Sequence, residues 1–134
     1  MLTHDLPRFA QRYNVPLKFN PFFPINTLPL MRGAHAAIEE GCFEAYVEAL
    51  YNGLWQDELN LGDVEIIKAT LKAAGLDAEK LMGLTQQQHI KDALMATTEE
   101  VVARGAFGAP TMYIGDEMFF GQDRIDFIEE RLQD

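Results

Sequence analysis

Apolar residues recur at intervals of three and four along most of this chain, and this spacing is typical of amphipathic helices. Leu6, Phe9 and Tyr13 predict a first helix over residues 3–13, which Asn14 is expected to end. Between residues 26 and 104 the same spacing returns almost without a break. Polar residues that start helices and glycines that stop them divide this stretch into five further helices.

Several helix boundaries follow from these start and stop signals. The second helix is expected to begin after Asn26 or Thr27 and to end at Gly41. Its expected inward stripe consists of Leu28, Met31, His35 and Ile38. A later helix is expected between Asp63 and Gly75. The run of residues 85–88, which starts with Thr85, has the form of a capping box that would open a long helix ending at Gly105.

Three short stretches of the sequence predict strands. Residues 15–19 are expected to form a short strand, with Pro16 at its start or on an edge. Residues 111–114 and 117–120 predict a hairpin around a Gly115-Asp116 turn, and Asp123 is expected to cap a last helix. The order of elements predicts an α/β domain that is mostly helical with a small sheet of three strands.

Composition narrows the classes of function. The chain has 134 residues, 48% of them hydrophobic, which fits one globular domain. Its formal net charge of −10 argues against nucleic-acid binding and gives no basic membrane anchor. No apolar stretch approaches the roughly 20 residues of a membrane helix, and the first residues do not resemble a signal peptide.

Reactive side chains are few. Cys42 is the single cysteine, so a reducing cytoplasm is the expected compartment. The three histidines and Cys42 show no spacing typical of metal ligands, so no metal is expected. The sequence contains no serine, which excludes a serine nucleophile for this chain acting alone.

Two motifs near the C-terminus carry candidate chemistry. In the first, Ala109-Pro110-Thr111 places a small residue and a proline at the start of a strand. The second surrounds Gln122 and Asp123 at a helix N-terminus, where unpaired N–H groups and the helix dipole favour bound anions. Each motif alone has a plain alternative: an ordinary loop proline, and an aspartate that only caps its helix.

Together these motifs resemble the cis-proline loop of thioredoxin-like proteins and the hairpin-to-helix signature of 2-hydroxychromene-2-carboxylate isomerases and kappa-class glutathione transferases. The resemblance implies glutathione as cofactor. The backbone of Ala109, beside Pro110, would pair with its cysteinyl part. Gln122 and Asp123 would hold its γ-glutamyl end.

A third stretch, residues 22–28 followed by Met31 and Arg32, is similar to the family's entry into a helical insertion. The resemblance implies that Phe22 and Phe23 line a pocket for a small aromatic electrophile. Simple filling of the core is the alternative for these two side chains, and the sequence leaves both open.

The resemblance also implies an organisation. Residues 1–25 and 105–134 would form an incomplete thioredoxin-like portion of the DsbA and kappa type, and residues 26–104 a helical insertion domain. The family's catalytic serine lies in an N-terminal segment without counterpart here, so no catalytic residue is assigned. The expected function is a glutathione-dependent isomerase in aromatic catabolism, truncated and weakly active or inactive alone. The alternatives are a kappa-class-like glutathione transferase and a non-catalytic glutathione-binding or assembly module, and a homodimer is expected.

Overall fold

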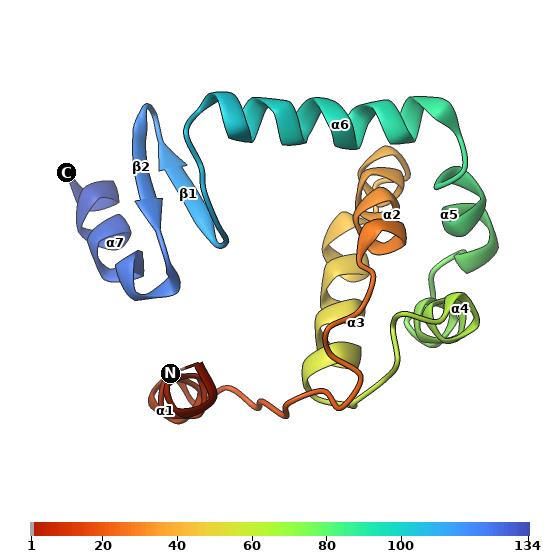
Figure 1. Ribbon diagram of the computed structural model, residues 1–134, viewed down its shortest axis with the longest axis horizontal. Coiled ribbons are helices and arrows are strands. Elements are labelled where there is room, and N and C mark those ends of the chain that lie inside the picture. The colour runs from red at the N-terminus through yellow and green to blue at the C-terminus, as the bar shows by residue number, and fades with distance from the viewer. Residues whose placement is uncertain (1) are drawn as a thin grey trace. The chain divides into compact units, whose positions relative to one another are not determined.

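A computed structural model describes residues 2–134, and Figure 1 shows the helices and the hairpin. The chain divides into two compact units, Met1–Leu94 and Met95–Asp134. The predicted division into a thioredoxin-like portion and an insertion stays a prediction. In chain order the described elements are α1 (Leu2–Tyr13), α2 (Leu28–Glu39), α3 (Phe43–Trp55), α4 (Val64–Ala73), α5 (Ala78–Leu84), α6 (Gln88–Ala103), β1 (Thr111–Ile114), β2 (Glu117–Phe120), the 3₁₀ helix η1 (Gln122–Arg124) and α7 (Ile125–Gln133).

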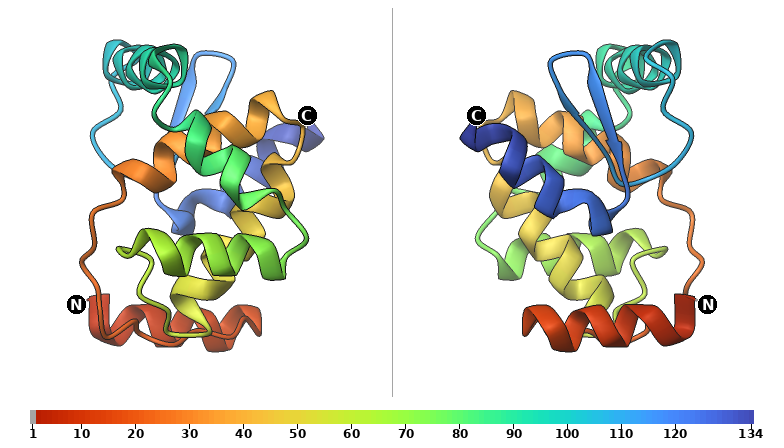
Figure 2. Two further views of the ribbon diagram at one scale, coloured as in Figure 1. Left: turned by 90° about the vertical axis from the view of Figure 1, so that its right-hand side faces the viewer. Right: turned by 90° about the vertical axis from the view of Figure 1, so that its left-hand side faces the viewer.

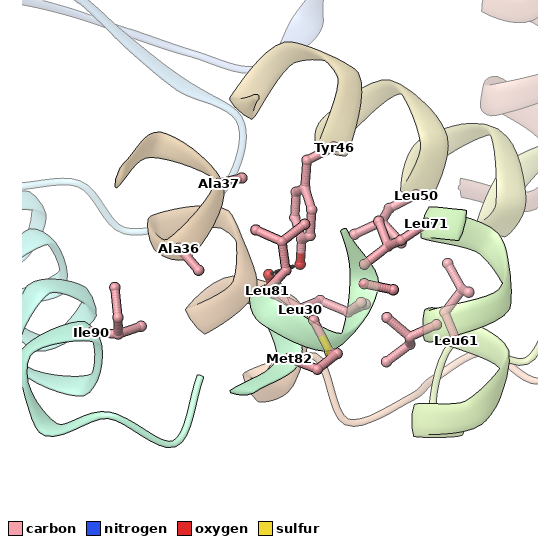
Figure 3. Packing of buried hydrophobic residues seen from close by; sticks show 12 residues of the cluster. Leu30, Ala36, Ala37, Tyr46, Leu50, Leu61, Leu71, Leu81, Met82 and Ile90 are labelled. Atoms are coloured by element: carbon pink, nitrogen blue, oxygen red, sulfur yellow. Dashed lines mark hydrogen bonds between the residues drawn. The ribbon is translucent and has the colours of Figure 1, made fainter. Parts of the chain in front are cut away.

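The core of the first unit lies between helices α2 to α5, with α4 packed against α3 (Figure 2). Its most deeply buried large side chains are Tyr46, Leu61, Ile67, Leu71, Leu81 and Ile90. The hydroxyl of Tyr46 donates a hydrogen bond of 2.7 Å to the carbonyl of Leu30 (Figure 3). Burial, and secondarily the nearby Cys42, raises the pKa of this phenol above its ordinary range. Tyr46 therefore joins α3 to α2 through a neutral hydroxyl.

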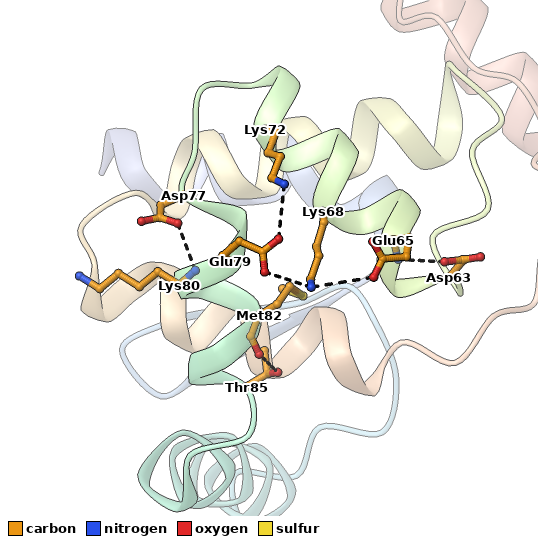
Figure 4. A network of polar contacts seen from close by, with 9 residues as sticks. All are labelled: Asp63, Glu65, Lys68, Lys72, Asp77, Glu79, Lys80, Met82 and Thr85. Atoms are coloured by element: carbon orange, nitrogen blue, oxygen red, sulfur yellow. Dashed lines mark hydrogen bonds and ion pairs between the residues drawn. The ribbon is translucent and has the colours of Figure 1, made fainter.

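The predicted start and stop residues of α4 are confirmed. The carboxylate of Asp63 accepts from the backbone N–H of Glu65 at 2.8 Å, as expected for an N-cap. Gly75 follows the helix with a φ of +80°, a conformation that glycine adopts without steric cost. On the outer surface Lys68 pairs with Glu79 at 3.1 Å, which ties α4 to α5 (Figure 4).

The predicted strand at residues 15–19 is wrong. These residues form no regular secondary structure. No second strand lies beside them within the described chain, and a strand needs a ladder of partners. Their one backbone bond to a distant segment runs from the N–H of Lys18 to the carbonyl of Trp55 at 2.6 Å. Among residues 2–134 the sheet therefore has two strands rather than the expected three.

The predicted inward stripe of α2 is also wrong. The residues that it buries are Leu30, Gly33, Ala36 and Ala37. Met31 and Ile38 of the predicted stripe are 49% and 56% exposed. Small residues allow the close approach of α3, so packing selected the opposite face of the helix.

The capping box expected at Thr85 is not formed. Thr85 follows α5 and its hydroxyl donates back to the carbonyl of Met82 at 2.5 Å. The Gln88 amide turns to Asp92 at 2.9 Å instead of reaching back to Thr85. Thr85 is 3% exposed, and the carbonyl of Met82 was the partner within its reach.

In the second unit, the predicted hairpin and its turn are confirmed. Strands β1 and β2 pair antiparallel, with Thr111 opposite Phe120. The guanidinium of Arg104 lies 3.8 Å from the centre of the Tyr113 ring and donates to the carbonyl of Gly115 at 2.9 Å. These contacts fasten the hairpin to the end of α6. No described helix is long and apolar enough to cross a membrane.

Candidate functional site

The loop between α6 and β1 carries the first predicted motif. The Ala109–Pro110 peptide bond is cis, which confirms the expected form of this loop. The Thr111 hydroxyl donates to the carbonyl of Gly108 at 2.6 Å and braces the loop from within. Within the described residues, no hydrogen bond engages the N–H or carbonyl of Ala109, which is exposed. This peptide backbone is therefore available to pair with a ligand.

The second predicted motif lies directly beside this loop. The N–H of Gly121 donates to the carbonyl of Pro110 at 2.9 Å, one step beyond the last strand pair. Gln122 and Asp123 follow immediately in η1. The structure thus brings together Ala109, Pro110, Gln122 and Asp123, four residues chosen from the sequence, at one end of the hairpin.

Gln122 and Asp123 both present oxygen atoms without partners. The side-chain oxygen of Gln122 is buried, and no described residue donates to it. The Asp123 side chain is exposed and forms no ion pair or hydrogen bond within the described chain. A buried acceptor without a donor is costly, and a ligand carrying an ammonium group would satisfy it.

The predicted role of Asp123 as a helix cap is not observed. No described side chain caps η1 or α7, and α7 begins after Arg124. The Asp123 carboxylate instead folds back toward Gly121, where an added side-chain carbon would lie 2.6 Å from Oδ1. The φ of Gly121 is +97°, which strains any other residue. Gly121 therefore allows the carboxylate to lie beside the loop.

Phe22 and Phe23 belong to the first unit, where a buried asparagine holds their loop. Asn20 donates from its amide to the carbonyls of Leu54 and Leu59 at 2.9 and 2.7 Å, and its oxygen accepts from the N–H of Phe22 at 2.7 Å. Phe22 and Phe23 are 50% and 53% exposed, so filling of the core does not describe them. Their role in an electrophile pocket remains a prediction.

An apolar groove of about 430 Å³ lies next to this loop in the first unit. Trp55 lines the groove and also contacts Phe23, with ring centres 5.6 Å apart. Leu6, Leu17 and Tyr51 are among the other lining residues, whereas Phe22 and Phe23 are not.

Sequence reasoning missed two features of these sites. Asn20 gave no periodic signal because its role depends on carbonyls more than 30 residues away in the chain. Phe107 and Phe120 were assigned no site role, although their ring centres lie 4.6 Å apart beside the proline loop. Phe107 stands two residues before Ala109, and this short spacing was the available signal.

Comparisons with known proteins identify the family of this chain. Residues 1–133 match the family model of the DSBA-like thioredoxin domain. A 2-hydroxychromene-2-carboxylate isomerase of Sphingobium xenophagum is 32% identical over 134 residues, which are all of this chain and 68% of that protein. Its counterpart of Pseudomonas putida is 29% identical over 98% of this chain and 64% of its own length.

A solved structure of 2-hydroxychromene-2-carboxylate isomerase superposes on 98% of this chain with a TM-score of 0.85 and 28% identity. The chain spans 64% of that structure's length. The agreement in backbone shows that the two chains share one fold over the matched residues. The chain belongs to the family of DSBA-like thioredoxin domains, within which its relatives are 2-hydroxychromene-2-carboxylate isomerases.

Proposed function

We propose that this chain carries the glutathione-binding part of a glutathione-dependent isomerase of the 2-hydroxychromene-2-carboxylate type, working in the cytoplasm. The observation that carries the proposal is the 2.9 Å bond from the Gly121 N–H to the Pro110 carbonyl. This bond holds the free peptide of Ala109 next to the unpartnered oxygens of Gln122 and Asp123. The names and structure of the relatives support the reaction type.

The residues present fit glutathione in three ways. The N–H and carbonyl of Ala109 would pair with the backbone of the cysteinyl residue. The buried oxygen of Gln122 would accept a hydrogen bond from the γ-glutamyl ammonium group. The Asp123 carboxylate would neutralise the charge of that ammonium group, and charge-assisted bonds of this kind are the stronger class.

When bound, glutathione supplies a thiolate that adds reversibly to a conjugated carbon of the aromatic substrate and thereby permits cis/trans isomerisation. The side chains of this chain hold and orient the tripeptide but do not generate the thiolate. The Thr111 hydroxyl is occupied by its bond to Gly108, and the sequence contains no serine. We therefore expect weak or no turnover from these 134 residues alone, and a normal isomerase rate from the mass-verified chain would refute this.

The proposal is tested by calorimetric titration of glutathione into the purified chain. Loss of a charged partner costs about 1.5–3 kcal/mol, so Asp123→Ala is expected to weaken binding about 10- to 100-fold. Asp126→Ala is the matched control, because this substitution removes the same charge from an exposed position in the first turn of α7. Equal effects of the two substitutions, or no saturable binding by folded protein, would reject the glutathione site.

A second candidate function is a non-catalytic binding or assembly module that forms a homodimer. It is favoured by the two-stranded sheet, whose outer edges are unpaired within the described chain. Unpaired edges expose backbone donors and acceptors that another chain can engage. Light scattering at several protein concentrations tests this: a stable dimer supports the module, and a folded monomer counts against it.

A further inference from the structure

Two aromatic rings form an exposed surface beside the proline loop. Phe107 is 70% exposed and Phe120 is 40% exposed. Their ring centres lie 4.6 Å apart at an angle of 44°, so they present one continuous apolar surface. Exposed aromatic surface of this kind commonly marks a binding site.

The backbone holds this surface in place. The Phe120 ring lies so close to Gly108 that an added side-chain carbon there would be 2.8 Å from Cε2. Phe120 also stands opposite Thr111, whose hydroxyl closes the loop onto Gly108. The pair is therefore built into the same loop that presents the free peptide of Ala109.

The hairpin register determines which face carries the pair. Opposed residues share a face, so Phe120 lies on the face of Thr111, and Met118 on the face of Tyr113. Alternation along β2 puts Phe120 and Met118 on the same face and Glu117 on the other. Glu117 pairs with Arg131 of α7 at 3.1 Å, which leaves the Phe120 face uncovered by α7.

We propose that Phe107 and Phe120 hold the aromatic ring of the electrophile next to the cysteinyl part of bound glutathione. This inference rests on the proposed function and specifies its substrate surface. Phe107 stands two residues before Ala109 in the chain, and Phe120 directly precedes Gly121. An aromatic group attached to the cysteine sulfur of glutathione paired with Ala109 would be within reach of both rings. Phe22 and Phe23, in the first unit, are the alternative surface for this ring, and the test below distinguishes the two.

The test compares three probes by calorimetry on the full chain: glutathione, S-methylglutathione and S-benzylglutathione. Stacking between aromatic rings predicts that the benzyl conjugate binds about 2- to 10-fold more tightly than the methyl conjugate. Phe107→Leu, which keeps an apolar side chain of similar size, is expected to remove this preference without changing the affinity for glutathione. Phe22→Leu is the matched control at an exposed phenylalanine and is expected to keep the preference.

The outcomes separate the two proposals. A benzyl preference that survives Phe107→Leu, or equal affinity of wild type for the two conjugates, would overturn the aromatic surface while the glutathione site stands. A preference lost in Phe22→Leu would move the electrophile to the first unit and likewise overturn the inference. If none of the three probes binds to the wild-type chain, and its circular dichroism spectrum shows a folded helical protein, the proposed function and the aromatic surface are overturned together.

Discussion

The contact between Gly33 and Tyr46 permits a sharp test of how α2 packs on α3. Gly33 is buried within α2, and the Tyr46 hydroxyl lies over it. A side-chain carbon added at Gly33 would be 2.1 Å from the hydroxyl oxygen and 2.9 Å from Cζ, whereas ordinary contacts are 3.4–4 Å. The substitution Gly33→Ala must therefore displace a tyrosine that is 2% exposed and bonded to Leu30.

The expected size of the effect follows from opposing contributions. Alanine in a helix interior is favoured over glycine by about 0.5–1 kcal/mol. Overpacking costs about 1–3 kcal/mol, and loss of the Tyr46 bond to Leu30 about 1 kcal/mol more. Gly33→Ala is thus expected to lower the free energy of unfolding by about 1–3 kcal/mol. Tyr46→Phe removes the hydroxyl oxygen, which is the atom closest to the added carbon. The double variant Gly33→Ala/Tyr46→Phe should therefore be about 1 kcal/mol more stable than the sum of the two single effects predicts.

Urea unfolding followed by circular dichroism and by the fluorescence of Trp55 measures these differences in the first unit. Gly83→Ala in α5 is the matched control, because no atom from another part of the described chain lies within 4 Å of the position that an added carbon would take. It should raise stability by about 0.5–1 kcal/mol. The reasoning is refuted if Gly33→Ala stabilises the protein as Gly83→Ala does, or if the effects of Gly33→Ala and Tyr46→Phe simply add.

Two further predictions concern the second unit and the ion network. Gly121→Ala, which forces an unfavourable φ and crowds Asp123, should destabilise the chain by about 1–3 kcal/mol and weaken glutathione binding; unchanged thermal unfolding would contradict this. Hydrogen bonds from Lys68 and then Lys72 lower the pKa of Glu79 below its ordinary 4.5. The ionised carboxylate therefore contributes stability above pH 4.5 that is lost as the pH falls through its folded-state pKa. The difference in free energy of unfolding between wild type and Glu79→Gln should accordingly shrink on acidification and in high salt. A difference that stays constant under both changes would count against the ion pairs of Glu79 with Lys68 and Lys72.

Local signals in the sequence located most helix ends and the hairpin. Asp63, Gly75 and Gly105 stand where caps and stops were predicted, because capping and a positive φ depend on a few neighbouring residues. The turn at Gly115 was recognised for the same reason. The cis peptide before Pro110 was expected from resemblance, and the structure agrees.

Packing between distant segments was beyond the reach of these signals. The helix α2 is apolar on two faces, and periodicity alone selected the face of Met31 and Ile38, which is exposed. The face with Gly33 is buried because Tyr46 of α3 approaches it closely. The sequence of α2 alone does not indicate this contact. Similarly, residues 15–19 are strand-like in composition but lack a neighbouring strand to pair with in the described part of the chain.

The candidate site shows the same division. The sequence by itself predicted the candidate residues, since Ala109, Pro110, Gln122 and Asp123 belong to short motifs that resemble those of a known family. Only the tertiary structure decided that they meet, through the bond from Gly121 to Pro110, and that Phe107 and Phe120 stand exposed beside them. The physical reason is that motifs depend on neighbours in the chain, whereas burial, register and free backbone groups depend on which segments the fold brings together.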